Sequence, residues 1–315
     1  MTLGTGRPDR GPAVDRAGRW VDGAFRLEAV LIYLFLYVPI LLVVIFSFNA
    51  GERTGELRGL SMRWYEYAIG DAFAMGALRN SIGVALWTSL LATTFGTLAA
   101  LALQRVPRVV RAVFDVLIYI AIIIPGIVIG ISTLIFFVNL FGFVNPWLAY
   151  VWSVGGLGEP PVVQKGLHTV IAAHVLFTMA IVMVLVRARL SGMDRSLTEA
   201  SFDLFATPLR TFFQVTLPQL APAIIAGALL AFTFSFDDFI IANFTAGPGQ
   251  PTLPMYIFNS IRRGITPEVN AIAAMVLMVT VTSLVIVALI YRRQARQGGA
   301  FGASEGAPIL EGDVA

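Results

Sequence analysis

The sequence contains no cysteine and few residues that could perform catalysis. Without cysteine it cannot form a disulfide framework or a thiolate metal site. The only lysine is Lys165, and no glycine-rich segment ends in Gly-Lys-Ser or Gly-Lys-Thr, so the chain lacks a loop that cradles nucleotide phosphates. His168 and His174 stand outside any His-Glu-x-x-His pattern, and no serine lies in Gly-x-Ser-x-Gly. The sequence therefore predicts no metal site and no enzyme, and we interpret both histidines as interfacial or packed side chains.

Charged residues are also scarce, at 13%, whereas 57% of the residues are hydrophobic and the mean hydropathy is +0.80. A soluble core cannot bury so many apolar residues, so lipid is the natural solvent for this chain. A helix needs about 20 apolar residues to span a bilayer. Six segments reach that length, at 27–48, 81–103, 113–141, 167–186, 222–244 and 271–291. We therefore expect an all-α polytopic membrane protein with six transmembrane helices, and Pro125-Gly126 predicts a kink or tilt in the third.

Positive charge is distributed unevenly about these six segments. Most of the 22 arginine and lysine residues fall on the side that carries both termini and the loop between the fourth and fifth segments. The positive-inside rule makes that side cytoplasmic. Residues 1–26 and 293–315 have little periodicity and are predicted to be disordered cytoplasmic tails around a membrane domain at 27–292. Juxtamembrane arginines account for the net charge of +3, so no nucleic-acid partner is predicted.

The loop between the fourth and fifth segments carries the most specific pattern in the chain. Residues 197–218 read LTEASFDLFATPLRTFFQVTLP. Ser196 and Glu199 have the spacing of a capping box, in which the glutamate reaches back to the start of a helix. Thr207-Pro208 offers a second N-cap followed by proline at the first helical position, and Pro218 follows the helix that results. The loop is predicted to form two short amphipathic helices joined by a turn.

This loop resembles the cytoplasmic coupling motif of ABC-importer permeases, which reads Glu-Ala-Ala, three residues, Gly, nine residues and Ile-x-Leu-Pro. Glu199-Ala200-Ser201 matches its first part, and residues 215–218 match its last part. One position departs, because Phe205 stands where the motif has glycine. Since phenylalanine resists the positive φ that glycine adopts, the turn is expected to be made differently or to shift to Ala206-Thr207.

The resemblance implies a set of residues and partners. The fold would be that of a type I ABC importer permease, with a permease module at about 80–292 and a coupling loop at about 193–218. The chain would itself bind no cofactor, because ATP would be bound by a cytoplasmic ABC ATPase dimer. A second permease subunit of similar fold, an extracytoplasmic solute-binding protein and membrane lipid would complete its surroundings. The implied ATPase-coupling residues are Glu199, Ala200, Ser201, Asp203, Leu204 and Pro218.

A second polar group lies inside the fifth apolar segment, at Asp237 and Asp238. A carboxylate near the bilayer centre costs about 2.5 to 3.5 kcal/mol even on a lenient insertion scale, so both should be shielded from lipid. Successive helical side chains point about 100° apart, so one acid can line a pathway while the other caps or pairs with a neighbouring helix. Together with Ser235 and Asn243 they form a candidate substrate pathway. A structural hydrogen-bonding role is equally open.

The block at 235–271 resembles the polyamine branch of these permeases, which transports spermidine and putrescine. Within it, Pro254 and Gly264 predict the start and end of a short external helix. Alternative substrates are a phosphonate, an opine-like compound or ferric iron. A different class, a secondary carrier, would use Asp237 or Asp238 as an ion relay, but it has no use for a coupling loop.

Overall fold

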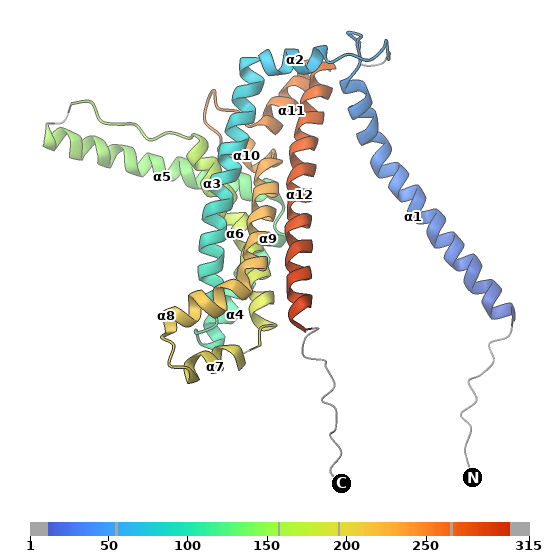
Figure 1. Cartoon of the computed structure of the whole chain (residues 1–315). Coiled ribbons are helices and arrows are strands. Elements are labelled where there is room, and N and C mark those ends of the chain that lie inside the picture. The colour runs from blue at the N-terminus through green and yellow to red at the C-terminus, as the bar shows by residue number, and fades with distance from the viewer. Residues whose placement is uncertain (1–11, 54–55, 157, 195, 265–266, 303–315) are drawn as a thin grey trace. The chain divides into compact units, whose positions relative to one another are not determined.

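The computed structural model describes residues 12–302 except 54–55, 157, 195 and 265–266. Every extended regular element in that part of the chain is a helix (Figure 1), and a lone antiparallel bridge joins Asn49 to Leu60. The first helices are α1 (Pro12–Ser47), α2 (Arg63–Gly70), α3 (Ala72–Ala102), α4 (Arg108–Ile123), α5 (Gly126–Gly155) and α6 (Leu167–Ser191). They are followed by α7 (Ser196–Asp203), α8 (Pro208–Thr211), the π-helix η1 (Phe212–Thr216), α9 (Leu217–Phe236), α10 (Ile240–Thr245), α11 (Leu253–Arg263) and α12 (Pro267–Gly302). The predicted all-α fold is confirmed.

Six helical stretches within the described residues are long and apolar enough to cross a membrane, as the sequence predicts. They are Gly23–Ser47, Ala72–Ala102, Gly126–Gly155, Leu167–Ser191, Pro208–Phe236 and Pro267–Ile286. The helices extend further at both ends of the chain than expected. Residues 12–26 belong to α1 and residues 293–302 to α12, so the prediction of disorder is wrong for these two stretches. Residues 1–11 and 303–315 of the predicted tails lie outside the described residues.

The third apolar segment is broken rather than kinked. Helix α4 ends at Ile123 and α5 begins at Gly126, with Ile124 in an extended conformation and Pro125 at the N-cap of α5. The reason is local, because proline lacks an amide donor and disfavours helical geometry in the residue before it. The single helix expected over 113–141 is therefore two helices, of which α5 is the membrane-spanning candidate.

The chain forms two compact units, one of residues 1–67 with 266–274 and the other of residues 68–265 with 275–315. In the first unit, the fully buried Asn49 organises the loop after α1. Its Oδ1 accepts hydrogen bonds from the amides of Gly51 (3.0 Å) and Arg58 (2.9 Å). Its Nδ2 donates to the carbonyls of Arg53 (3.1 Å) and Glu56 (2.7 Å). A single asparagine thus satisfies backbone groups on both sides of this loop.

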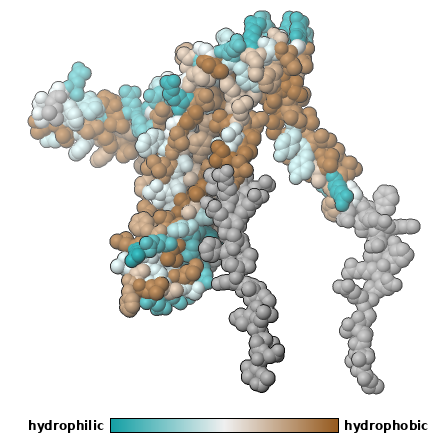
Figure 2. Space-filling view, in the orientation of Figure 1, coloured by the Kyte–Doolittle hydropathy of each residue, from teal (hydrophilic) through white to brown (hydrophobic). Residues whose placement is uncertain are grey.

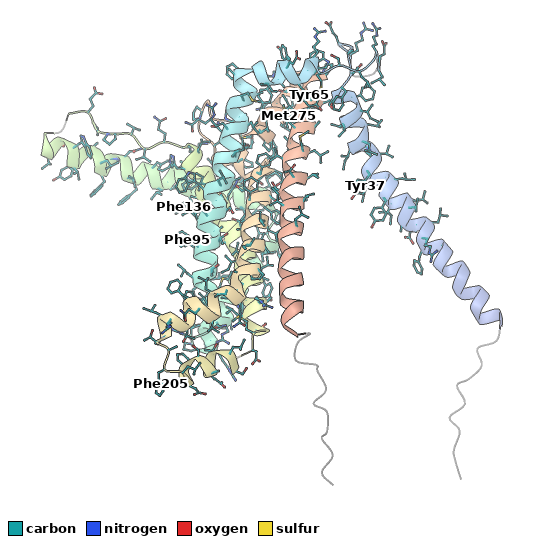
Figure 3. All side chains as sticks on the ribbon, viewed as in Figure 1. Tyr37, Tyr65, Phe95, Phe136, Phe205 and Met275 are labelled. Carbon is teal, nitrogen blue, oxygen red and sulfur yellow. The ribbon has the colours of Figure 1, made fainter. Side chains whose placement is uncertain are left out.

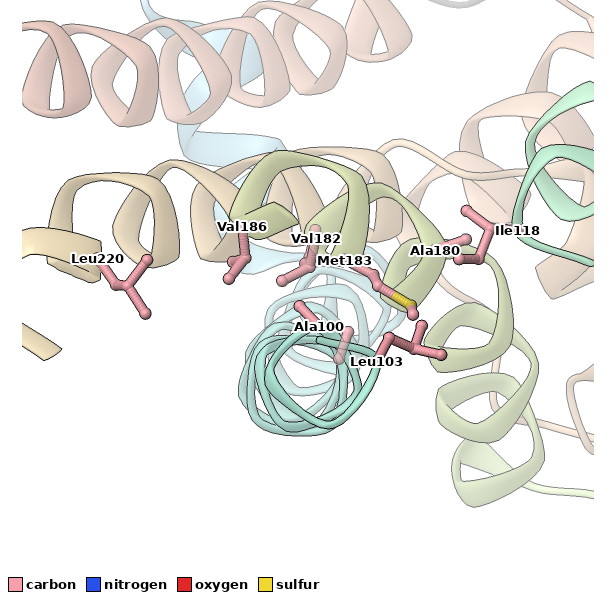
Figure 4. Close-up of a cluster of buried hydrophobic side chains, with 10 residues drawn as sticks. Ala100, Leu103, Ile118, Ala180, Val182, Met183, Val186 and Leu220 are labelled. Atoms are coloured by element: carbon pink, nitrogen blue, oxygen red, sulfur yellow. The ribbon is translucent and has the colours of Figure 1, made fainter. Parts of the chain in front are cut away.

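The core of the second unit is the contact of α3, α6 and α9 (Figure 4). Val182 of α6 is fully buried and fits between two glycines. A Cβ atom on Gly96 of α3 would lie 3.0 Å from the Val182 side chain, and one on Gly227 of α9 would lie 3.1 Å from it. Small residues at these positions let the helix backbones approach closely, which is how helices associate in lipid.

The end of this unit that carries α11 is fastened to α3 by hydrogen bonds between distant parts of the chain. The amide of Leu253 donates to Ser81 Oγ (2.8 Å), and the Tyr256 hydroxyl donates to Asp71 Oδ2 (2.6 Å). Burial raises the pKa of Asp71, but the hydroxyl of Tyr256 and the amides of Phe73 and Ala74 outweigh it, so the pKa lies below its usual value. The α11 bounds confirm the helix predicted near Pro254 and Gly264.

The packing of Val182 generates a prediction about two glycines of α3. Gly96→Ala should lower the free energy of unfolding in detergent by about 1 to 3 kcal/mol, because the added methyl overpacks the contact. Gly83→Ala is the matched control in the same helix, since a Cβ there meets nothing within 4 Å; it should raise stability by about 0.5 to 1 kcal/mol through helix propensity. Thermal unfolding measures both. Equal effects of the two substitutions would contradict this account of the core.

Candidate functional site

The predicted coupling loop lies at one end of the α3–α6–α9 bundle, opposite α11 (Figure 1). Helix α7 is the first of the two short helices that the sequence predicts; the second is wrong as a separate short helix, because α8 continues through η1 into α9. In Figure 2 hydrophilic and hydrophobic surface are mixed at this end of the unit, below the mostly hydrophobic surface of the long helices. Polar residues at the end of an apolar bundle are typical of a segment outside the bilayer.

The start of α7 differs from the prediction. Ser196 is the first residue of α7 that the structure describes, and its amide donates to Asp194 Oδ1 (2.9 Å). The capping box of Ser196 and Glu199 is therefore wrong, because Asp194 takes the capping role. This hydrogen bond lowers the pKa of the Asp194 carboxyl, which is ionised at neutral pH. Glu199 is left exposed on the first turn of α7, free to meet another surface.

The end of α7 places an exposed phenylalanine in a left-handed conformation. The amide of Phe205 donates to the Phe202 carbonyl (2.9 Å), and the amide of Ala206 donates to the Ser201 carbonyl (3.1 Å). These two bonds define a Schellman motif, which needs positive φ at Phe205. Its φ is 58°, so the expectation that the turn would avoid this residue is wrong. Phe205 is 96% exposed, at the outer end of the loop (Figure 3).

The second part of the loop continues without a break into the membrane. Thr207 caps α8 as predicted, and its Oγ1 accepts from the Arg210 amide at 3.4 Å. Helix α8 then passes through the π-helix η1 into α9, giving one helical stretch from Pro208 to Phe236. Pro218 lies inside this continuous stretch, directly after η1, so it does not follow the end of a helix as predicted.

Most of the implied coupling residues are exposed. Glu199, Ala200, Asp203, Leu204 and Pro218 are exposed. Ser201 is half-buried, and its hydroxyl bonds that of Thr211 (2.9 Å), which ties α7 to α8. Glu199 also lines a cavity of about 1080 Å³ between the loop and the ends of α3, α4 and α6. The same cavity is lined by Arg187 of α6, which pairs with Asp115 of α4.

The acid pair lies at a break between two helices. Helix α9 ends at Phe236 with Asp237 as its C-cap, and α10 begins at Ile240, so the single helix expected over 222–244 is wrong. Asp238 Oδ1 accepts from the Ala242 amide (3.0 Å) and so supplies the start of α10 with an acceptor. At the other end of α10, the carbonyl of Phe244 accepts from Lys165 Nζ (3.3 Å) and that of Thr245 from Thr169 Oγ1 (2.7 Å). The break thus leaves these backbone groups satisfied, as an apolar medium demands.

A histidine that the sequence did not connect with the acids completes this arrangement. His174 of α6 is 2% exposed. Its Nδ1 lies 2.8 Å from Ser235 Oγ, and its Nε2 lies 3.3 Å from Asp238 Oδ1. Ser235 stands 61 residues away in the chain, so no local pattern could have indicated the contact. The burial of His174 confirms its interpretation as a packed side chain.

The remaining candidates point away from the protein core. The Asp237 side chain is exposed, and so is Asn243 of α10. The Asp238 side chain is 20% exposed and held by Ala242. The structure therefore brings Ser235 and Asp238 together with His174, places Asp237 beside them, and leaves Asn243 apart on an outer face. Three or more metal-ligating side chains do not gather anywhere in the described part of the chain.

The turn after α7 generates a prediction. Phe205→Gly should raise the free energy of unfolding by about 1 kcal/mol, because glycine adopts positive φ without the steric cost of a side chain. The neighbouring substitution Ala206→Gly is the control. Phe205 is the only described non-glycine residue with positive φ, so Ala206 gains no such relief and should lose about 0.5 to 1 kcal/mol. Thermal unfolding in detergent distinguishes the two; a loss in both variants would refute strain at Phe205.

This chain is similar in sequence to a known protein family and to several of its members. The family described as binding-protein-dependent transport system inner membrane component matches residues 92–297. The putrescine transport system permease protein PotI of Escherichia coli strain K12 is 39% identical over 259 residues, which cover 82% of this chain and 87% of that protein. The spermidine/putrescine transport system permease protein PotC of Haemophilus influenzae is 31% identical over 263 residues, which cover 84% and 94%.

The fold is also found in a solved transporter. A chain from the crystal structure of a bacterial ABC transporter involved in the import of the acidic polysaccharide alginate superimposes with a TM-score of 0.68, covering 90% of this chain and 97% of that one at 16% identity. That similarity shows a shared fold alone. With the family match over more than half of its length, the chain belongs to the multi-pass inner membrane components of binding-protein-dependent transport systems, the permease subunits of ABC importers.

Proposed function

We propose that this permease subunit imports polyamines, putrescine first among them. The observation that carries the proposal is an exposed carboxylate, Asp237, at a break in a helix that is otherwise apolar enough to span the membrane. Such a group is too costly to face lipid, so it should face a water-filled pathway or a partner subunit. Polyamines carry ammonium groups, and a carboxylate at reduced dielectric attracts them strongly. The relatives named for putrescine and spermidine transport support the same substrate class.

We place both termini and the coupling loop in the cytoplasm, because most of the arginines lie on that side. The exposed residues Glu199, Ala200, Asp203 and Leu204 of that loop then meet a cytoplasmic ATPase subunit, which binds the ATP. A second permease of similar fold covers the exposed face of the acid pair. An extracytoplasmic solute-binding protein delivers the substrate at the end that carries α11.

One helix connects the two functional regions. From Pro208 to Phe236 the chain is helical over 29 residues, or about 43 Å at 1.5 Å per residue. The ATPase dimer, on closing around ATP, pushes α7 and α8, and this helix carries the displacement to the break at Asp237. The subunits then pass from an inward-facing to an outward-facing arrangement, a population shift driven by differential ATP binding. No feature favours the secondary-carrier alternative, which would not need this loop.

The substrate role of Asp237 is testable in the complex reconstituted with its partner subunits in proteoliposomes. Asp237→Asn should lower the amount of putrescine transported per ATP hydrolysed about tenfold, the effect of losing about 1.4 kcal/mol of attraction for the cation. ATPase stimulation by the loaded binding protein should persist. Glu66→Gln removes an equally exposed charge from α2 and should change neither quantity. If Asp237→Asn transports putrescine normally, the substrate assignment fails.

The coupling role of Glu199 is a separate prediction. Glu199→Ala should leave assembly and thermal stability unchanged, because the side chain is exposed and caps no helix. It should reduce putrescine uptake at least about tenfold and make the ATPase insensitive to the loaded binding protein, since the displacement no longer reaches α9. Glu159→Ala, an exposed carboxylate in the loop after α5, is the control. Normal uptake by the Glu199 variant would remove this residue from the coupling surface.

A further inference from the structure

We propose that His174 is a positioning residue that holds Asp238 at the helix break and thereby leaves Asp237 as the one carboxylate of the pair that meets the ammonium group of the substrate. The inference rests on the proposed function and deepens it. It assigns separate tasks to two adjacent acids and a task to a histidine on another helix.

The burial and polarity of His174 carry the first step. The imidazole is 2% exposed and lies between α6 and the break that follows α9. Asp238 Oδ1 can only accept, so the tautomer that suits it carries the proton on Nε2. Nδ1 then accepts from the Ser235 hydroxyl at 2.8 Å. Both ring nitrogens are thus directed at residues within four positions of Asp237.

The second step is that Nε2 has no other partner. It is buried without a hydrogen bond, and Asp238 Oδ1 is 3.3 Å away, at ion-pair distance but without hydrogen-bond alignment. A buried polar atom left without a partner is costly, so the nearest acceptor is favoured strongly. Because Oδ1 also accepts from the Ala242 amide, Asp238 is held from two sides, by α6 and by α10.

Asp237 is in the opposite situation. Its side chain is exposed, and no other residue in the described part of the chain donates a hydrogen bond to it. Two adjacent carboxylates repel each other, and the contact with His174 draws one of them toward α6. The pair therefore presents one open acceptor to the pathway and one that is engaged.

This division suits transport. A site in a pathway must attract the substrate but also release it, and two free carboxylates would hold an ammonium group more tightly than one. Engagement of Asp238 by a neutral imidazole keeps its charge but occupies Oδ1, so the direct contacts with the ammonium group are those of Asp237.

The test uses the reconstituted complex and two substitutions that separate the ring nitrogens. In His174→Gln the amide reaches the position of Nε2 and keeps the contact with Asp238. In His174→Asn the amide reaches only the position of Nδ1 and keeps the contact with Ser235. Putrescine transported per ATP hydrolysed should stay within about twofold of the unmodified complex in the glutamine variant. It should fall about five- to tenfold in the asparagine variant, within the range of coupling between residues in contact.

Two further variants complete the design. His168→Leu changes the exposed histidine at the start of the same helix and should have no effect. His174→Asn combined with Asp238→Asn should transport no less per ATP than Asp238→Asn alone, because the histidine acts through that carboxylate. If His174 were purely structural, its substitution would reduce the amount of assembled complex and therefore the ATPase activity. The amount of putrescine transported per ATP hydrolysed would stay unchanged.

The outcomes separate this inference from the proposed function. If the unmodified complex transports no putrescine, the proposed function fails. If it transports putrescine but His174→Asn and His174→Gln give the same ratio, or if the effects of His174→Asn and Asp238→Asn add fully, the positioning role is overturned while the importer stands. If the His174→Asn complex does not assemble, the glutamine variant alone decides. A fall in putrescine transported per ATP hydrolysed in His174→Gln as large as that in Asp238→Asn would overturn the positioning role.

Discussion

The close approach of α6 to α9 is the constraint on which the other features depend. Val182 fits against Gly227 without room for a methyl group between them. His174 lies eight residues before Val182, and Ser235 lies eight residues after Gly227, so the antiparallel helices meet again at the same spacing in the histidine–serine contact. Glycine at position 227 thus sets a backbone distance about three turns away from the acid pair. A larger residue there would move Ser235 and the helix break away from His174.

An apolar surrounding imposes a second constraint, because a helix that stops inside it must leave no backbone group without a partner. The two interruptions meet this demand in different ways. At Pro125 the proline has no amide to satisfy. At the break after α9, side chains form hydrogen bonds with the backbone of α10. Asp238 accepts from an amide at its start, and Lys165 and Thr169 donate to carbonyls at its end. The only lysine in the chain is therefore engaged at a helix terminus, where its charge also complements the helix dipole.

Much of this architecture could be predicted from local sequence. Hydropathy indicated six spans, and Thr207-Pro208 and Gly264 indicated ends of helices, because those signals act within a few residues. Three features could not be predicted in this way. The end of α9 at Phe236 lies beside a contact with α6, about 60 residues away in the chain, and the apolar residues resume directly after Asp237 and Asp238. The positive φ of Phe205 runs against its own propensity and is maintained by two backbone hydrogen bonds. The contact of His174 with Ser235 depends on tertiary packing alone.

The apolar end of the coupling loop has a consequence for the cell that makes this protein. Leu204 is 82% exposed and Phe205 is 96% exposed, side by side outside the apolar bundle. Exposed apolar patches of this kind promote aggregation unless a partner covers them. In the proposed assembly the ATPase covers this patch, so copies synthesised in excess of the ATPase would carry it uncovered and become clients of chaperones and proteases. The same two side chains would then limit the number of permease subunits that persist to the number of ATPases available.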